Sequence, residues 1–404
     1  MAMRHATSPL RNPVSACSAL PLLVVAAVTV VEASPESRPL TREAYDLAYD
    51  LRLKASLDLL SRARAVDPAD PAPARAVAAV TWLSILCAQG VATFTAFEGT
   101  ATGDVVARPA APEALRSRFT IHVEQAIALA ERERHRRPHD LDAQYQLGAS
   151  LGLRALYRGT VDGSAFDAFT DGRKAVSLLN SLRRGDAQHH EAALLPGIYR
   201  YAVSTLSFPK RLLAAAAGLG GDRDVGVALL ETAAKDTAAT ASDASIVLMI
   251  IYNREGRYRE ALRHLRVLHR RHPANRLLRL NLAATELAAG DGAAAVKTIG
   301  DDVAARLVDE PEIPGERALW LYIRGAARVT LGDPSAAADL QEALRASPRQ
   351  WVRARVHLEL ARLAWSSGSR AMAQTERARA MHHARRAGDE RALAMARQLP
   401  GDFE

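Results

Sequence analysis

Tyrosine and arginine side chains gather in the middle of the chain, in residues 153–226. The residues that we expect to line a ligand pocket there are Tyr157, Tyr199, Arg200, Tyr201 and Arg211. Tyr and Arg are enriched where binding sites carry energy, because each combines a large apolar surface with a polar tip. Two rings at positions 199 and 201 cannot both be buried on one helical face. The alternative is that one ring packs on a neighbouring helix while an Arg stem covers it.

A glycine-rich run at 218–226 has the composition of a phosphate-binding loop. Such loops follow a buried strand and present converging backbone N–H groups at the start of a helix. Here no strand is predicted before the run, no Gly-Lys-Ser/Thr follows it, and Asp222 places a negative charge at the expected phosphate position. We therefore expect a turn between two helices, with Asp222 as the N-terminal cap of the second.

Adjacent histidines at His189 and His190 are candidates for a metal site. Neighbouring side chains on a helix point about 100° apart, so a metal ion here would need ligands from elsewhere. Three histidines in 264–272 do not share one helical face, and no His-Glu-x-x-His or closed Cys/His framework is present. The kinase and P-loop signatures are also missing. We expect no metal ion, no cofactor and no enzymatic activity.

The elements that must position these residues are helices. The chain has 404 residues, of which 49% are hydrophobic and only 5% aromatic, and no run alternates apolar and polar residues as a strand would. The net charge of +8 comes from 53 basic and 45 acidic residues. Phosphate binding needs a concentrated basic stripe, whereas the densest basic stretch here lies at the end of a predicted helix. We expect an all-α protein with no nucleic-acid partner.

A spacing that returns four times predicts how the helices are arranged. A small residue is followed four positions later by Leu or Ala and eight positions after that by Pro, as in Ser56-Leu60-Pro68, Ala126-Ala130-Pro138, Ala261-Leu265-Pro273 and Ala336-Leu340-Pro348. Leu248, Gly256 and Ala261 recur 34 positions later as Leu282, Gly290 and Ala295. A fixed period of this length is typical of stacked helical hairpins, each of which buries its apolar face against its neighbours.

The segment from Asp243 to Pro273 resembles a tetratricopeptide repeat (TPR), with Leu248, Tyr252, Gly256, Ala261 and Pro273 at the family's positions. The resemblance implies a right-handed α-solenoid of TPR-like hairpins, here with an irregular central segment. That segment is similar to a variant hairpin of exported bacterial TPR proteins. The inner groove would be lined by first-helix residues, namely Ile246, Ile250, Asn253, Leu280, Ala284 and Leu287. Because these are mostly apolar, the groove suits an amphipathic helix or an extended apolar segment.

The first forty residues have the features of an export signal. Arg4 and Arg11 precede an apolar run at 19–31, and small residues lead to a cleavage site after Ala33. The run is shorter than the 17–25 residues that cross a bilayer, so we expect no membrane span after its removal. The alternative is that the true start lies downstream. After removal only Cys87 remains, in an apolar segment, and we expect it to be a buried apolar residue without a disulfide.

The predicted organisation has seven parts. These are a signal peptide at 1–33, N-terminal hairpins at 34–98, a loop at 99–113, one unit with the irregular centre at 114–240, two TPR units at 241–300, a loop at 301–315, and C-terminal units with a cap at 316–400. We expect an exported protein, periplasmic or extracellular. Its expected function is a non-enzymatic protein- or peptide-binding scaffold of the cell envelope. The alternative is a small-molecule or lipid-binding protein with a pocket in 153–226, and an enzyme on the same insert is the third.

Overall fold

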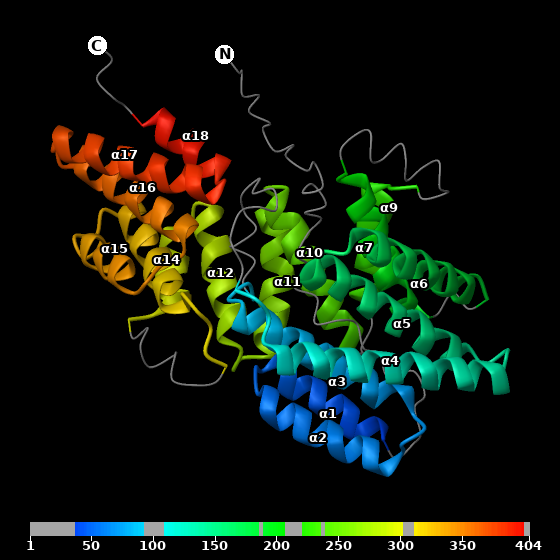
Figure 1. Ribbon diagram of the computed structural model, residues 1–404. Helices are drawn as coiled ribbons and strands as arrows, with labels where there is room; N and C mark the ends of the chain where they lie inside the picture. Colours follow the sequence, from blue (N-terminus) through cyan, green and yellow to red (C-terminus); the bar gives the residue numbers. More distant parts are fainter. Residues whose placement is uncertain are drawn as a thin grey trace, which may run out of the picture.

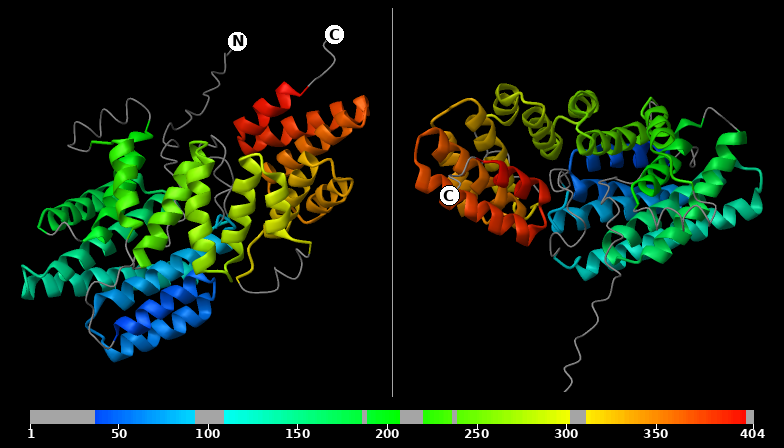
Figure 2. Two further views of the ribbon diagram at one scale, coloured as in Figure 1. Left: turned by 180° about the vertical axis from the view of Figure 1, so that it is seen from behind. Right: turned by 90° about the horizontal axis from the view of Figure 1, so that it is seen from above.

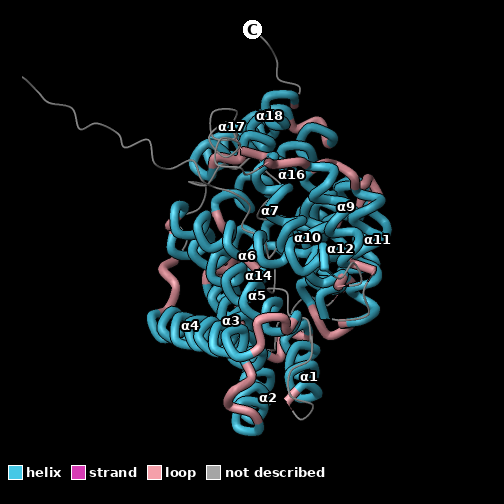
Figure 3. Tube along the Cα trace, turned by 90° about the vertical axis from the view of Figure 1, so that its right-hand side faces the viewer, coloured by secondary structure: helices cyan, strands magenta, loops and turns pink. Residues whose placement is uncertain are grey.

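A computed structural model describes residues 37–92, 109–185, 189–206, 220–235, 239–301 and 311–399. Within those ranges all regular structure is helical, as Figure 3 shows, which confirms the predicted all-α class. Figure 1 labels the elements. Their bounds are α1 (Arg38–Tyr49), α2 (Leu53–Val66), α3 (Pro71–Ala88), α4 (Glu113–Arg136), α5 (Leu141–Tyr157), the π-helical turn η2 (Arg158–Asp162), α6 (Ala165–Gly185), the 3₁₀ turn η3 (His190–Ala193), α7 (Leu194–Ser204), α9 (Arg223–Ala233), α10 (Ala239–Arg254), α11 (Tyr258–Arg271), α12 (Arg276–Ala288), α13 (Gly292–Ile299), α14 (Glu316–Thr330), α15 (Ala336–Arg345), α16 (Gln350–Ser366), α17 (Arg370–Ala387) and α18 (Glu390–Gln398).

The helices pack as consecutive antiparallel hairpins that stack into an α-solenoid. The pairs with the most extensive packing are α1/α2, α3/α4, α5/α6, α7/α9, α10/α11, α12/α13, α14/α15 and α16/α17, and α18 packs on the last of them. The repeat residues have the roles expected of them. Gly256 and Gly290 have positive φ values of 71° and 86° where the first helices of two hairpins end, a backbone conformation that glycine adopts without strain. Ala261 and Ala295 are fully buried on the second helices, where a small side chain permits close packing.

One predicted boundary is placed differently by the structure. The loop expected at 99–113 was taken to separate the N-terminal hairpins from the rest, but α3 packs most extensively on α4, across that loop. Residues 93–108 lie outside the described part of the chain. The two helices therefore form one hairpin with a long connection, and the repeat spacing alone does not show this because it marks only the second helix of each pair.

Helix α3 is the inner element of the molecule. Sixteen of its 18 residues are buried, and a helix that is apolar all round needs neighbours on every side. Helices α2 and α4 supply two of these sides. At its C-terminal end the Gln89 carbonyl oxygen accepts a hydrogen bond from the Arg349 guanidinium, and the charges of Arg276 and Glu316 act on the Cys87 thiol. The solenoid thus curls around its own N-terminal hairpins, which Figure 2 shows on the inner side of the arc of later helices.

Helix α1 meets the middle of the chain at a second set of contacts. The Tyr49 hydroxyl donates to Asp243 Oδ1 at 2.5 Å, and its ring stacks on His272 with centroids 4.8 Å apart. The side-chain amide of Asn275 donates to the Tyr49 carbonyl oxygen at 2.5 Å. These contacts join residues 194 to 226 positions apart, so they hold the N-terminal hairpin against α10–α12.

The length and composition of α3 also satisfy the criteria for a membrane span. Of the helices in the described ranges, Pro71–Ala88 is the one that does so, and 89% of that window is buried inside the protein. A core helix of a soluble protein passes the same test. Cys87, near its end, is 1% exposed, and burial raises the pKa of its thiol to about 12. Cys87 is therefore an apolar core residue, as expected, and not a reactive thiol.

Candidate functional site

The six residues expected to line an open inner groove do not lie on an open surface. Ile246, Ile250, Asn253, Leu280 and Ala284 are buried, and Leu287 is partly buried. The Asn253 amide donates to the Met249 carbonyl oxygen at 2.9 Å and accepts from Thr285 at 3.1 Å, so its polar atoms are used inside the protein. The prediction of an accessible groove is wrong at these positions. Neighbouring helices of the stack pack on α10 and α12, and α1 adds contacts to α10 and to Asn275 at the start of α12.

The five candidate residues in the centre of the chain differ in burial and in their contacts. Tyr157 is buried and stacks on Phe119 with ring centroids 3.7 Å apart. Tyr201 is also buried, and its hydroxyl donates to Glu255 at 3.2 Å. Arg200 is half-buried on α7, and Arg211 lies outside the described residues. Of the four candidates that the structure describes, Tyr199 alone lines the apolar cavity between α5, η2, α6 and α7. The expectation that the two rings at 199 and 201 point to different sides of one helix is therefore correct.

That cavity lies between α5, η2, α6 and α7, inside the segment named as irregular from the sequence. Its volume is about 220 Å³. The walls are almost wholly apolar, with Leu, Ile, Val and Ala side chains, two aromatic rings (Phe169 and Tyr199) and the hydroxyl of Thr160. Four glycines also line it, namely Gly152, Gly159, Gly163 and Gly172. An apolar cavity with one or two polar groups is the usual form of a small-molecule site.

The cavity exists because glycines and a π-helical turn leave space between the helices. A Cβ atom added at Gly172 would have its nearest neighbours, in Ala155 and the Tyr199 ring, at 3.9 Å, which is ordinary contact. At Gly163, where φ is +70°, a Cβ would meet nothing within 4 Å. Gly152 is different, because a Cβ there would lie 2.2 Å from Leu195. The helices are thus tightly packed at one end of the cavity and separated at the other.

The π-helical turn η2 is held in place by a buried carboxylate. Asp171 on α6 is 2.8 Å from Arg154 Nε and 2.6 Å from Arg158 Nη1, and the Asp171 side chain is 4% exposed. These two ion pairs connect the end of α5 and the start of η2 to α6. Wider π turns inside α-helices occur frequently at functional sites. Sequence reasoning missed this turn, since only Gly159 and Gly163 mark it.

The Tyr199 hydroxyl is the one polar feature of the cavity wall that has no partner. Its oxygen is buried and makes no hydrogen bond with any described residue. Burial raises the pKa of Tyr199 to about 12, while the nearby charge of Arg173 acts to lower it. A buried hydroxyl without a partner costs about 1–3 kcal/mol, so its position needs an explanation.

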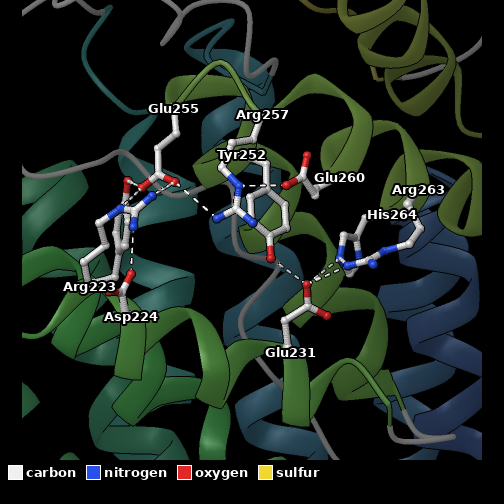
Figure 4. Close-up of polar contacts among 10 residues, drawn as sticks. Arg223, Asp224, Glu231, Tyr252, Glu255, Arg257, Glu260, Arg263 and His264 are labelled. Carbon is white, nitrogen blue, oxygen red and sulfur yellow. Dashed lines mark hydrogen bonds and ion pairs between the residues drawn. The ribbon is translucent and has the colours of Figure 1, made fainter.

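A polar network joins the irregular centre to the regular repeats, as Figure 4 shows. Glu255, at the end of α10, accepts from Arg223 at the start of α9. Glu231 on α9 accepts from the Tyr252 hydroxyl at 2.6 Å and from Arg263 at 2.7 Å. These carboxylates have basic or phenolic partners and therefore serve to fix α9 against α10 and α11. Asp222 accepts from the Val225 backbone N–H at 3.0 Å, which confirms the predicted cap.

Residues 148–152 read Gly-Ala-Ser-Leu-Gly, which has the Gly-x-Ser-x-Gly spacing of many hydrolases. In hydrolases such a serine sits on a strained turn from a strand into a helix, with its hydroxyl exposed. Here Ser150 lies inside α5 and is fully buried. The spacing is a result of close helix packing at the two glycines.

No three His, Cys, Asp or Glu side chains within the described ranges come together as a metal site. His264 stacks on Tyr252, with centroids 5.9 Å apart, and His272 stacks on Tyr49. His189 and His190 lie at the start of η3. The histidines of 264–272 that the structure describes therefore serve in packing contacts.

The fold defines the class of this protein: an α-solenoid of TPR-like helical hairpins. No protein-family model matches the chain, and no curated protein matches it in sequence. Solved structures similar to it include a tetratricopeptide repeat protein from Parabacteroides merdae, with 14% identity, a TM-score of 0.29, and coverage of 80% of this chain and 98% of that one. Yeast Tom70 is similar with 13% identity, a TM-score of 0.34, and coverage of 90% and 88%.

Proposed function

We propose that the protein is a non-enzymatic binding protein that holds a small apolar molecule or an acyl chain in the cavity between α5, η2, α6 and α7. The observation that carries this proposal is the contrast in burial. The inner face of the regular repeats is filled by the protein's own helices, whereas the irregular centre keeps an apolar cavity. Apolar surface removed from water is the main driving force for such binding.

The volume of the cavity limits the size of the ligand. An apolar cavity of about 150 Å³ holds benzene, which has six carbons, so about 220 Å³ has room for roughly nine carbons. A medium-length acyl chain fits this size. The absence of charged groups from the wall favours a hydrocarbon part over a sugar or a nucleotide.

The test is calorimetric titration of the purified full chain with decanoate, compared with a variant in which the cavity is filled. Gly172→Leu adds a side chain in the open part of the cavity, where the Cβ meets no close neighbour. Gly185→Leu is the matched control, since it lies on the same helix in open space. We expect binding to the wild type and to the control and at least a tenfold loss in Gly172→Leu. Equal binding by all three would place the ligand elsewhere.

A protein- or peptide-binding scaffold of the cell envelope is the second candidate. The observation that favours it is that α10 and the start of α12 already contact a helix, the chain's own α1. A partner helix would have to displace the N-terminal hairpins or use another face. Crosslinking in cells, followed by mass spectrometry, tests this candidate: a reproducible partner crosslinked to α10 or α12 supports it, and crosslinks that stay within the chain argue against it.

Export is part of the same proposal. The expected signal peptide at 1–33 lies outside the described residues, and the proposal rests on its sequence pattern. Sequencing the N-terminus of the protein recovered from fractionated cells tests it. A chain that starts at Ser34 in the periplasmic or extracellular fraction is expected, and a chain that starts upstream in the cytoplasmic fraction would contradict it.

A further inference from the structure

The orphan hydroxyl of Tyr199 indicates what kind of head group the ligand carries. The side chain lines the cavity, and its oxygen is buried without a hydrogen-bond partner in the described structure. The great majority of buried polar side-chain atoms in proteins have a partner. A phenolic hydroxyl is a good donor to a carboxylate or phosphate oxygen. A ligand with such an acceptor would supply the partner that the protein itself does not.

Arg173 and Arg200 each follow a residue of the cavity wall in the sequence and bring positive charge near it. Arg173 follows Gly172, whose position is in contact distance of the Tyr199 ring, and its charge acts on the Tyr199 hydroxyl. Arg200 follows Tyr199 on α7, and its charge acts on Arg183 of α6. None of these three is in an ion pair among the residues that the structure describes.

The acidic residues of the same helix do not neutralise this charge. Asp171 is already held by Arg154 and Arg158, and Asp167 accepts a hydrogen bond from Ser164 at 2.7 Å at the start of α6. Neither carboxylate of α6 is therefore paired with Arg173.

We propose that the ligand is an anionic amphiphile, whose acyl chain fills the cavity and whose carboxylate or phosphate accepts a hydrogen bond from the Tyr199 hydroxyl beside Arg173. The inference rests on the proposed function and specifies its ligand class. The head group combines hydrogen bonding with charge attraction, and the tail contributes apolar burial. A free fatty acid and an anionic phospholipid share this chemistry, and the experiment separates the two sources.

The first measurement compares three ten-carbon probes by calorimetry with the full chain at physiological ionic strength: decanoate, 1-decanol and decyltrimethylammonium. We expect decanoate to bind at least tenfold more tightly than decanol, and the cation most weakly. Equal affinity for decanoate and the cation would overturn the anionic preference while leaving the apolar cavity in place. No binding of any probe would overturn the proposed function as well, so the two failures are distinguishable.

Two variants test the residues named. Tyr199→Phe removes the donor and keeps the ring, so decanoate should lose about tenfold in affinity and decyltrimethylammonium should be unchanged. Arg173→Gln should weaken decanoate several-fold. Its control is Arg184→Gln, which removes the same charge about 16 Å farther along α6, beyond the screening length at physiological salt. Equal effects of the two Arg variants would assign the preference to net charge alone and contradict the site.

Vesicles identify the source of the ligand. Sedimentation with phosphatidylglycerol vesicles is compared with phosphatidylcholine vesicles, for the wild type and Gly172→Leu. Binding to phosphatidylglycerol that is lost in Gly172→Leu assigns a membrane phospholipid to the cavity. Decanoate binding without vesicle binding assigns a free fatty acid. Vesicle binding that Gly172→Leu leaves intact, together with no decanoate binding, would place lipid recognition outside the cavity and overturn the inference.

Discussion

The hairpins of α10–α13 and the irregular centre of α5–α7 bury apolar surface in different ways. In the regular hairpins the inner residues, such as Ile250 and Leu280, are buried, and α1 of the N-terminal hairpin contacts α10. In the centre, glycines and the turn η2 keep the helices apart, and a cavity of about 220 Å³ remains. Both regions contribute residues to the main hydrophobic core, while Phe169, Tyr199, Val203 and Leu206 of the cavity wall form a small separate cluster.

The comparison shows that a repeat pattern does not by itself specify a free binding face. An apolar inner face is unstable in water until something covers it, and in this chain the nearest occupant is the chain itself. The apolar cavity of the centre lies where the pattern is interrupted. The predictions that follow test the filled region first and the open one last.

The largest loss of stability is expected when α3 loses its largest buried side chain. Trp82 on α3 is fully buried, so Trp82→Ala should lower the free energy of unfolding by about 3–5 kcal/mol. Urea denaturation followed by circular dichroism measures this. The control is Ile121→Ala on α4, where the side chain is 63% exposed and a change within about 0.5 kcal/mol is expected. A small effect of Trp82→Ala would mean that α3 is not the inner element.

Acid should weaken the contact between α1 and α11 through His272. Burial, aided by Arg271, lowers the pKa of His272 to about 4, whereas in the unfolded chain a histidine titrates near about 6.5. The folded protein therefore favours the neutral ring. Its stabilisation is complete above about pH 6.5 and is lost as the pH falls towards 4, by up to about 3 kcal/mol.

The measurement is the urea midpoint as a function of pH for the wild type and His272→Gln. The variant should show a shallower decline between pH 6.5 and 4. His135→Gln, at an exposed position of α4, is the control and should follow the wild type. Asp50 lies 3.8 Å from His272 Nδ1, so Asp50→Asn should make the decline steeper. Identical pH profiles for the wild type and His272→Gln would show that protonation of His272 does not contribute to the loss of stability in acid.

Removing single hydroxyls compares the two regions directly. Tyr49→Phe deletes a buried hydrogen bond of 2.5 Å to Asp243 and should cost about 2 kcal/mol, because the acceptor is a carboxylate. Tyr201→Phe deletes a longer bond of 3.2 Å to Glu255, which also accepts from Arg223, and should cost about 0.5–1 kcal/mol. Thermal or urea unfolding of the pair measures the difference. The reverse order would mean that the centre is held more firmly than the N-terminal contact.

The smallest effect concerns two glycines that differ only in the space beside them. Gly172→Ala should raise the free energy of unfolding by about 0.5–1 kcal/mol, since alanine is the better helix former and its Cβ meets no close neighbour. Gly152→Ala should destabilise, because its Cβ would lie 2.2 Å from Leu195. The same sign for both variants would contradict the description of the cavity as open at one end and packed at the other.

Local features of the fold were predictable from the sequence and long-range ones were not. The glycines that end two first helices, the alanines at helix crossings and the cap at Asp222 depend on a few neighbouring residues, and each was expected correctly. The closure around α3 depends on pairs such as Tyr49 and Asp243, which are 194 residues apart, and no periodicity relates them. The prediction of an open groove at the six residues was wrong because residue type and spacing do not show how completely neighbouring helices cover a position.

The sequence indicated which segment holds the candidate site but not which of its residues line the cavity. The break in the repeat period located it within 153–226, and Tyr199 was one of five candidates. Tyr157 and Tyr201 were indistinguishable from it by residue type, and only the register of α5 and α7 decides which ring lines the cavity. The turn η2 left no mark in the sequence beyond its glycines, because a π turn differs from an α turn by one inserted residue.

The closure of the solenoid has a consequence for synthesis of the chain. Arg349, which contacts the end of α3, follows Gln89 by 260 residues. At about 5–20 residues per second, ribosomes need on the order of 10–50 s to make that length. During this interval Gln89 has been made while Arg349, its partner across the arc, has not. Helices α1 to α5 can already pack on α3, so the contact that closes the arc is expected to be among the last to form.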